Sequence, residues 1–474
     1  MPGPYLAPGV YVEEVPPLAR PIAGVGTSTA GFIGVIPDNF IISLESVSKK
    51  TIDVGDGSKT SFNLPQSDYP VDTTTGKFTI RVNGNLVTDA TLTNDDANRI
   101  SKVDLTSAPG AGQKIEGDYI ITRKIVVGAG EPKLCTSFDD YKKYFGDFSA
   151  TDSKQNTLTH AVYGFFNNGG SRCYVVRAKQ DSDIRDDFLA RSFEPIDEIA
   201  IVAAPGLIDS GIRSALVTHC AVKTKDRIAV LDCPELIENT GQLDLTKLNP
   251  LSANNILPDK SDYAAFYFPW IQVFDSATKA QNPTGDGLKY VPPGGHIAGI
   301  YARVDKERGV FKAPANEPIY GALGLKYNIS QAQQEGLNPQ GVNVIRSLNG
   351  NIRVWGARTI RGDANGEYKY ISTRRLYNFL RESIDQGTQF AVFEPNSPAL
   401  WQRITRNVSD FLLGQWRDGA LFGDTPKQAF FVRCNAETNP SDVRERGEVV
   451  TEIGVAIVKP AEFVVFRIQQ ITGG

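Results

Sequence analysis

Three side chains stand where catalytic groups are often found. His219 and Cys220 are neighbours in the sequence, and Asp232 closes the apolar run RIAVLD. A cysteine nucleophile needs a base within reach, but adjacent residues on a helix or strand point their side chains apart. One carboxylate without a partner defines no reaction. We therefore interpret His219 and Cys220 as structural and Asp232 as a hydrogen-bonding partner of the Cys-Pro turn that follows it.

The motifs that usually mark enzymes and metal sites are missing from the sequence. There is no G-x-x-x-x-G-K-[ST], G-x-S-x-G or H-E-x-x-H pattern, and TTGKFT at residues 73–78 has Gly-Lys alone. The glycines at 24, 26 and 31 precede a strand-like run, which is the wrong context for a dinucleotide fingerprint. The histidines are only three: His160, His219 and His296. We predict no enzyme activity, no catalytic residue, no cofactor and no metal.

Cysteine usage points to a reducing compartment. The five cysteines are scattered and include no C-x-x-C pair: Cys135, Cys173, Cys220, Cys233 and Cys434. We expect them to be buried free thiols.

Composition is that of an ordinary soluble protein. Apolar residues make up 41% of the 474 residues, charged residues 22%, and the formal charge is −4, so nothing indicates nucleic acid. The start of the chain lacks the features of a signal peptide, and no apolar run approaches the roughly eighteen residues of a membrane span. We expect synthesis in the cytoplasm and no membrane insertion.

The segment from 126 to 350 has an α/β pattern. The helical stretch NTLTHAVYGFFNNGG precedes the strand-like CYVVRA, and the apolar runs EIAIVAAPG, RIAVLD and AAFYFPW follow in turn. Apolar strands that alternate with helices predict a buried sheet covered on both faces.

The segment from 41 to 125 differs in texture. It is rich in Thr, Asp, Asn and Gly with short alternating runs, and Asn83-Gly84 in KFTIRVNGNLV is a hairpin signal. We predict a small inserted all-β domain, whose role the sequence leaves open.

The segment from 351 to 474 begins with the strand-like NIRVWGART and carries two amphipathic helices. In the first, Ser372 is a candidate N-cap and Gly387 a stop. In the second, Ser397 is the cap and Pro398 the first helical residue. Arginines on the second helix, namely Arg403, Arg406 and Arg417, form either a solvated face or a contact with an acidic partner.

Strand-like runs close the sequence and one opens it. KQAFFVRC, EVVTEIGVAIVKP and AEFVVFRIQQI follow the helices, while APGVYVEEV at residues 7–15 stands alone between prolines. This first run has no local hairpin partner, so its hydrogen bonds must be made elsewhere.

Several long segments resemble the tail sheath family of contractile phages and contractile injection systems. They are PGVYVEEV, RPIAGVGTSTAGFIG, VPPGGHIAGIYARVDKERGVFKAPAN, GVNVIRSLNGNIRVWGARTI and YISTRRLYNFLRESIDQGTQFAVFEPNSPALWQRITRNVSDFLLGQWRDGALFG. The β segment at 50–124 does not match well.

The resemblance implies an α+β multidomain fold. Its parts are an N-terminal arm and start of the core at 1–40, an inserted outer β domain at 41–125, an α/β middle sheath domain at 126–350, and a C-terminal inner sheath domain at 351–474 with exchanged terminal β-strand arms. The arm residues are Val10, Tyr11, Val12, Val15, Phe463, Val464, Phe466 and Ile468. The receiving strand carries Ile453, Val455 and Ile457 and is extended by β-augmentation.

The function implied by the resemblance is structural. Stacked hexameric rings of the subunit surround an inner tube, and contraction drives the tube through a target envelope. The implied partners are copies of the chain, the inner tube protein, and baseplate and tail terminator or cap proteins, with no nucleic acid and no direct membrane insertion. The subunit would be made in the cytoplasm of the producing bacterium and assembled into a phage tail or an injection-system particle. Arg403, Arg406 and Arg417 are the candidate tube contacts.

An α/β enzyme with an accessory β domain is the alternative. Its site would lie near Pro205-Gly206 and Asp232. A static structural protein, such as a non-contractile tube or a capsid component, is a further possibility that the α/β bulk disfavours.

Overall fold

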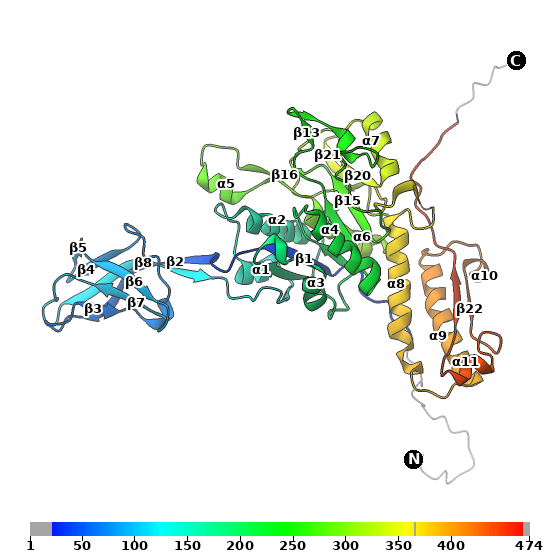
Figure 1. Ribbon diagram of the computed structural model, residues 1–474, viewed down its shortest axis with the longest axis horizontal. Helices are drawn as coiled ribbons and strands as arrows, with labels where there is room; N and C mark the ends of the chain where they lie inside the picture. The colour runs from blue at the N-terminus through cyan, green and yellow to red at the C-terminus, as the bar shows by residue number, and fades with distance from the viewer. Residues whose placement is uncertain (1–20, 365, 468–474) are drawn as a thin grey trace, which may run out of the picture. The chain divides into compact units, whose positions relative to one another are not determined.

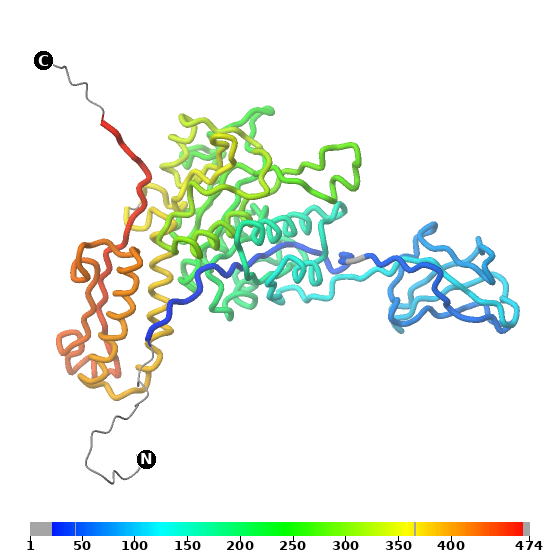
Figure 2. Tube along the Cα trace, turned by 180° about the vertical axis from the view of Figure 1, so that it is seen from behind, coloured from blue at the N-terminus to red at the C-terminus, as the bar shows by residue number. Residues whose placement is uncertain are grey.

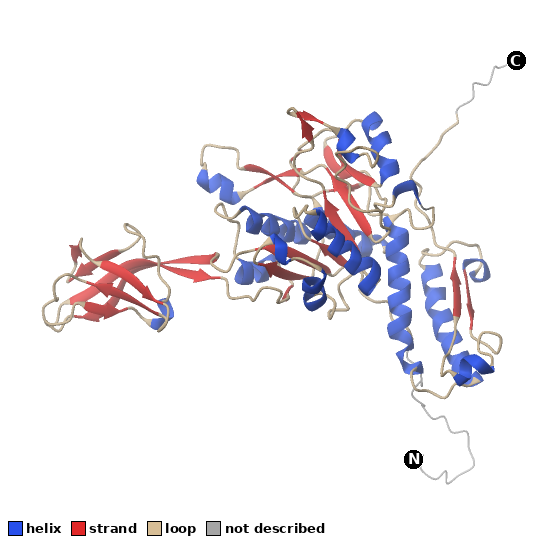
Figure 3. Ribbon diagram, viewed as in Figure 1, coloured by secondary structure: helices blue, strands red, loops and turns tan. Residues whose placement is uncertain are grey.

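The computed structural model describes residues 21–364 and 366–467 and divides into two compact units. The larger unit comprises Thr27–Glu307 and Ala313–Ile371. The smaller comprises residues 21–26, Arg308–Lys312 and residues 372–467. Both contain helices and strands (Figures 1 and 3), which confirms the mixed α/β class expected from the sequence. Within the described residues, no helix combines the length and the apolar character needed to cross a membrane.

A nine-stranded sheet organises the larger unit, in the order β18-β21-β20-β15-β12-β11-β1-β10-β9. The six strands from β20 to β10 run parallel, and β18, β21 and β9 add antiparallel edges. The strand bounds are β1 Ala30–Val35, β9 Lys133–Cys135, β10 Cys173–Ala178, β11 Ile201–Ala203, β12 Ile228–Asp232, β15 Ala264–Phe268, β18 Glu317–Pro318, β20 Val342–Leu348 and β21 Asn351–Val354.

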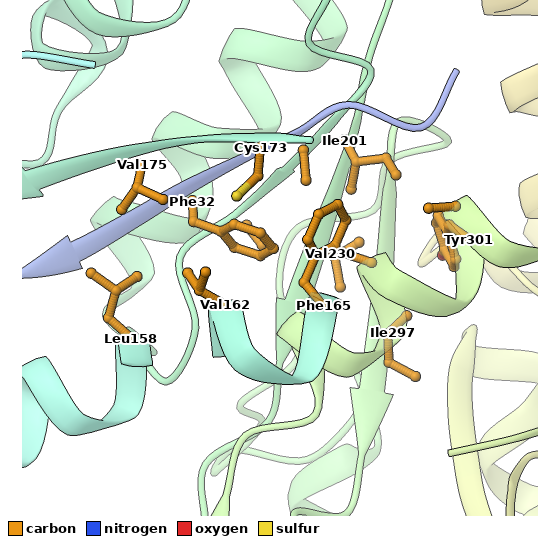
Figure 4. Close-up of a cluster of buried hydrophobic side chains, with 14 of the residues drawn as sticks. Phe32, Leu158, Val162, Phe165, Cys173, Val175, Ile201, Val230, Ile297 and Tyr301 are labelled. Carbon is orange, nitrogen blue, oxygen red and sulfur yellow. The ribbon is translucent and has the colours of Figure 1, made fainter. Parts of the chain in front are cut away.

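Helices cover both faces of this sheet, which is why its strands are apolar runs without polar alternation. The helices of the larger unit are α1 Phe138–Phe145, α2 Ser153–Asn167, α3 Asp186–Ser192, α4 Ser210–Thr218, α5 Ser276–Gln281, α6 Gly294–Arg308 and α7 Gln331–Leu337. Phe32 of β1 packs with α2 and α6 on one face (Figure 4), and its neighbour Ile33 packs with α3 and α4 on the other.

Glycines allow α2 and α6 to touch backbone to backbone. A Cβ atom on Gly295 would lie 2.3 Å from the Cα of Ala161, and one on Gly299 would lie 2.4 Å from the carbonyl oxygen of Phe165. Real Cβ atoms do not approach so closely, so a larger residue would push the two helices apart.

A smaller antiparallel sheet, β17-β16-β19, and the short pair β13-β14 complete the α/β part of the larger unit. Their bounds are β13 Glu238–Asn239, β14 Gln242–Leu243, β16 Ile271–Phe274, β17 Leu288–Val291 and β19 Gly324–Leu325.

The regular elements of residues 41–124 are strands and one short turn of helix. The chain enters this segment through β2 and leaves through β8, which pair with each other from Ile41↔Lys124 to Val54↔Lys114 (Figure 2). The predicted hairpin is confirmed, since β4 and β5 pair through Val82↔Asn85 with Asn83 and Gly84 both at positive φ. Ten buried apolar residues form a core of its own. The bounds are β2 Ile41–Val54, β3 Ser61–Asn63, β4 Thr79–Val82, β5 Asn85–Val87, β6 Thr91–Asp95, β7 Ile100–Asp104 and β8 Lys114–Lys124.

The smaller unit packs two long helices against a two-stranded sheet. Its elements are α8 Ile371–Thr388, α9 Pro398–Arg417, α10 Pro426–Ala429, β22 Phe430–Arg433, α11 Ser441–Glu445 and β23 Glu452–Val455. The predicted start of α9 is confirmed: Ser397 holds the N-cap position and Pro398 the first helical one.

The ends predicted for α8 are wrong. The helix begins at Ile371 and runs through Gly387 to Thr388, so Ser372 lies inside it and is buried. Gly387 does not stop the helix; its missing side chain makes room for Ile22, whose Cγ1 would lie 2.6 Å from a Cβ there. Tertiary contact, which the local pattern does not record, sets both positions.

Strand β21 also differs from expectation. The run NIRVWGART was expected in the C-terminal domain, but Asn351–Val354 pairs with β20 in the nine-stranded sheet, and the C-terminal stretch of the smaller unit begins at Ser372.

Candidate functional site: a sheet edge in the C-terminal unit

Strand β23 is held in place by one face of alternating side chains. Ile453 and Val455, with Ile457 just beyond, pack on the core formed with the buried stripe of α9. The intervening Glu452, Gly454 and Ala456 face away from the helices, as the two-residue period of a strand requires. The sequence pattern EIGVAIV therefore makes a strand with one buried side.

Within the described residues, the backbone of the same strand makes its hydrogen bonds on one side, toward β22 and residues 420–422. Ala456 donates its N–H to the carbonyl oxygen of Ala429 at 2.8 Å, and its own carbonyl accepts from the N–H of Phe422 at 2.7 Å. The register Phe431↔Gly454 continues this alternation toward β22. The N–H and C=O groups of Ile453, Val455 and Ile457 consequently point to the opposite side. We call these groups the outer edge.

No strand from residues 21–364 or 366–467 pairs with the outer edge, since the sheet there consists of β22 and β23. An exposed row of donors and acceptors is a template for pairing with another strand. The three residues predicted to receive an arm are thus the three whose backbone groups form this edge.

The C-terminal segment that follows carries exposed apolar side chains. Phe463, Val464, Val465 and Phe466 are 71%, 71%, 77% and 84% exposed. Residues 459–467 form no strand within the subunit, which differs from the expected C-terminal strand. A strand needs a partner strand, and residues 463–466 are paired with no strand among the described residues. The other predicted arm residues, Val10, Tyr11, Val12, Val15 and Ile468, lie outside the described residues.

The three arginines proposed for an acidic partner have different surroundings. Arg403 pairs with Glu394 at 3.1 Å and stacks on Phe390 at 4.8 Å, so its charge is engaged within the unit. Arg406 and Arg417 are exposed. They lie about three turns apart, on the side of α9 opposite its buried stripe. These two are better placed for a partner than Arg403.

Asp232 sits at the carboxyl end of β12 and serves the fold. Its carboxylate accepts the backbone N–H of Gly294 at 2.8 Å, at the start of α6, and that of Gly206 at 3.2 Å. Burial raises the pKa of Asp232 to about 7, although both hydrogen bonds and the nearby Arg213 act in the opposite direction. Asp232 thus has a structural role, as expected, but it binds Gly206 and Gly294 and not the Cys-Pro turn that the sequence suggested as its partner.

A cavity of about 410 Å³ lies near these strand ends, beside Gly206 and Asp209. The charged groups in its wall are neutralised locally, since Lys154 pairs with Asp181 at 2.8 Å, and Asp209 caps α4. The cavity therefore offers no pair of groups prepared for acid–base chemistry.

His219 and Cys220 are buried and do not form a nucleophile and base. Burial, with Arg227 at 3.4 Å, lowers the pKa of His219 to about 4. Burial raises the pKa of the Cys220 thiol to about 12, so it stays protonated and unreactive. All five cysteines are free and buried, as predicted.

The other two histidines, His160 and His296, are also buried. His160 lies 3.4 Å from Asp275. Burial alone would raise the pKa of Asp275, but the nearby His160 and hydrogen bonds from Thr278 and Asn156 hold it well below its usual range. Across the described residues, no group of three or more His, Cys, Asp or Glu side chains could hold a metal ion.

One feature of this region was missed in the sequence analysis. Phe422 and Phe431 are 72% and 53% exposed on the side of the β22–β23 sheet that faces away from the helices. The alternation in AFFVRC signals it, since Phe430 faces the core and its neighbour must face outward.

Models of two sheath domains match most of the chain beyond residue 185. The model of the phage tail sheath protein central domain matches residues 186–360, and that of the phage tail sheath C-terminal domain matches residues 363–471. Together they cover more than half of the chain.

One curated relative and two solved structures illustrate the similarity. The tail sheath protein of Burkholderia phage BcepMu is 26% identical over 243 residues, which are 50% of this chain and 48% of the relative. The chain thus spans about half the length of this relative. The sheath of an extracellular contractile injection system, PVC, in its contracted state has a TM-score of 0.64 at 23% identity and covers 98% of both chains. The baseplate of the anti-feeding prophage, 6-fold symmetrised, gives a TM-score of 0.63 at 23% identity and covers 99% of this chain and all of that one.

Proposed function

Since the chain belongs to the phage tail sheath family, we propose that it is a structural subunit of a contractile sheath. In this proposal the subunits polymerise as stacked hexameric rings around an inner tube. The rings contract to drive the tube through a target envelope. The energy comes from two packings of one lattice, so the subunit needs no catalytic group, cofactor or metal.

The observation that carries the proposal is the match between the outer edge and the C-terminal segment. The edge offers the backbone groups of Ile453, Val455 and Ile457, and residues 463–466 offer an extended apolar run without a partner. A strand from a second copy would complete the sheet by β-augmentation. The N-terminal run with Val10, Tyr11, Val12 and Val15 is the second proposed arm.

The strength of such a link is sufficient to join subunits. About six backbone hydrogen bonds at a net ~1 kcal/mol each, with three or four apolar side chains at ~1.5–3 kcal/mol each, give on the order of 10 kcal/mol. The cost of ordering the arm reduces this figure. In this proposal the link stays made while the bodies it joins rotate, and the residues next to each arm take up the change in backbone angles.

Contact with the inner tube is the second element of the proposal. Arg406 and Arg417 on the exposed face of α9 provide a weak electrostatic contact that can break during contraction. Arg403, the third residue first considered, supports the α8–α9 connection through Glu394.

The proposed partners follow from the same family. They are further copies of the chain, the tube protein, and baseplate and terminator or cap proteins. The proposed setting is a phage tail or an injection-system particle assembled in the cytoplasm of the producing bacterium.

Electron microscopy of the purified chain tests the proposal. The full-length protein is compared with one truncation that lacks residues 1–20 and another that lacks residues 459–474. Long hollow cylinders from the full-length chain and none from either truncation are expected. Dispersed particles from the full-length chain, over a range of concentrations and with tube protein added, would overturn it.

A further inference from the structure

The outer face of the β22–β23 sheet is apolar. We define it as the surface formed by Phe422, Phe431 and Gly454, on the side away from α8 and α9. The ring of Phe431 lies over Gly454, since a Cβ there would come within 2.1 Å of it. Arg433 stacks on the same ring at 5.8 Å and pairs with Glu452 at 3.4 Å, so charged groups bound the face at one end.

The C-terminal segment is apolar on both of its sides. In an extended chain Phe463 and Val465 point one way, and Val464 and Phe466 point the other. Strand β23 is different, because its second side carries Glu452, Gly454 and Ala456. A strand that is covered on one side only has polar residues on the other. The arm therefore belongs in a place where both of its sides are buried.

The apolar outer face and the two-sided apolar arm come together when the arm docks. At the outer edge, one side of the arm joins the core beside Ile453 and Val455. Its other side lies level with Phe422 and Phe431, in either register. Docking thus enlarges the outer face from two exposed rings to a larger apolar surface, whose exposure to water is unfavourable.

We propose that the outer face, enlarged by the docked arm, is an interface that binds the folded body of a further copy of this chain. The inference rests on the sheath function proposed above. It adds a contact between the β22–β23 sheet, once a second subunit's arm has docked on it, and a third subunit. This contact is separate from the exchange of arms between two subunits.

The position of α9 favours a sheath subunit over the tube as the partner that binds the outer face. Helix α9 packs on the inner side of β22, and Arg406 and Arg417 lie on its far side. The tube-facing surface and the outer face are therefore opposite surfaces of one two-layer unit. If the arginines face the tube, the outer face turns away from it and toward other sheath subunits.

Photocross-linking identifies the occupant directly. A benzophenone-bearing phenylalanine analogue replaces Phe431 in the full-length chain, and cylinders are assembled from equal parts of nitrogen-15-labelled and unlabelled subunits, with tube protein present. Cross-links between labelled and unlabelled chains that reach residues 21–458 of the second chain are expected. Cross-links confined to residues 1–20 and 459–474, cross-links to the tube protein, or none at all would overturn the inference.

A substitution experiment separates this interface from the arm link. The double variant Phe422→Ser with Phe431→Thr should need at least about tenfold more protein to form cylinders, which corresponds to about 1.4 kcal/mol. Its backbone amides at Ile453, Val455 and Ile457 should still gain protection from hydrogen exchange when subunits mix, because the arm can dock. Leu86→Ser, which changes an exposed apolar residue on β5, is the matched control.

The outcomes for the two proposals differ. Cylinders at the wild-type concentration from the double variant would overturn the outer-face inference and leave the sheath function intact. Failure of the unmodified chain to form cylinders would instead overturn the sheath function on which the inference rests.

Discussion

At the scale of single residues, helix α9 carries two kinds of arginine. Arg403 is held by Glu394 and Phe390, whereas Arg406 and Arg417 are exposed to solvent. The sequence shows three equivalent cations on one amphipathic helix. The difference arises from the α8–α9 connection, which folds Glu394 and Phe390 back onto the first turns of α9.

Reversal of charge at the two exposed arginines tests their role. The double variant Arg406→Glu with Arg417→Glu should assemble poorly on the tube at low salt, and the defect should shrink as salt screens the contact. Its melting temperature as an isolated subunit should match the wild type, because exposed charges contribute little to stability. Assembly is measured by sedimentation with tube protein. Unchanged tube-templated assembly would remove the tube contact from α9.

Asp232 gives the fold a pH dependence with a definite sign. Its folded-state pKa of about 7 lies above the ordinary value, so between about pH 4 and 7 the folded chain holds a proton that the unfolded chain has lost. Its contribution to stability is complete below about pH 4 and is lost as the pH rises through 7. His219, whose pKa falls to about 4, acts in the opposite direction over the same window.

The variant Asp232→Asn measures the pH-dependent contribution of Asp232 to stability. The variant should be more destabilised relative to wild type at pH 5 than at pH 7, by on the order of 2 kcal/mol, because it lacks the protonation that favours the wild type in acid. Thermal unfolding of both proteins at the two pH values measures the difference, in which the histidines cancel. Parallel pH profiles would contradict the buried, proton-binding carboxyl.

At the scale of elements, even-numbered and odd-numbered residues of β23 have different roles in hydrogen bonding. The even positions bond to β22 and its neighbours, and the odd positions present the outer edge. Proline lacks the N–H group, so its effect depends on which parity it occupies.

Two adjacent proline variants use this parity. Ile457→Pro removes an N–H group of the outer edge and should weaken assembly. Because it also removes a half-buried side chain from the core, it should lower the stability of the subunit by about 1–2 kcal/mol, which still leaves it folded. Ala456→Pro removes the N–H donated to Ala429 and should destabilise the subunit itself. Circular dichroism and electron microscopy distinguish the two. Normal cylinders from Ile457→Pro would mean that strands do not add at this edge.

The contact between α2 and α6 is the second element-scale test. Gly295→Ala should destabilise the larger unit by about 3 kcal/mol, because the new methyl group meets the backbone of Ala161. Gly336→Ala, in the exposed helix α7 with nothing within 4 Å, should be neutral or stabilising by up to ~1 kcal/mol. Chemical denaturation measures both, and equal effects would mean that the helices can move apart freely.

Local sequence patterns correctly predicted the features that depend on the backbone preferences of neighbouring residues. The cap and proline at the start of α9 and the Asn83-Gly84 hairpin follow from backbone preferences of those residues. The ends of α8 failed because Ser372 is buried and Gly387 accommodates Ile22. Residues 459–467 read as a strand, yet within one subunit they have no strand, because the partner that a strand needs lies on another chain in our proposal.

At the scale of the whole molecule, residues 41–124 are attached through a single pair of strands. Ile41 and Lys124 pair directly, so the chain leaves and returns at almost the same point. The segment has its own buried core around Phe62, Val103 and Ile115. Its removal should leave the remaining chain with its ends about 5 Å apart.

A deletion tests this independence. Residues 42–123 are replaced by a two-residue turn of Asn and Gly that joins Ile41 to Lys124. The shortened chain should unfold at a melting temperature within a few degrees of the wild-type α/β unit, and it should still form cylinders. Aggregation of the purified product would contradict the independence, and soluble subunits without cylinders would assign the segment a part in assembly.

The molecule as a whole was easier to predict than its site. Apolar runs separated by helical stretches predict a parallel sheet covered by helices, and the resemblance of several long segments indicates the family. The outer face escaped notice, because Phe422 and Phe431 come from separate parts of the sequence, and only the fold brings Phe431 over Gly454 and Phe422 beside Ala456. Likewise, no pattern in the sequence reveals that Arg403 pairs with Glu394 and stacks on Phe390 while Arg406 is exposed.

The parity of β23 bears on how such a protein can change over generations. The hydrogen bonds of a joint made from peptide N–H and C=O groups do not depend on which side chains the strands carry, provided that β23 keeps its alternation and the arm stays apolar. Subunits can therefore accumulate substitutions in the arm and in the edge independently, without compensating changes in the partner. Copies from diverged lineages should for the same reason still join in one mixed cylinder.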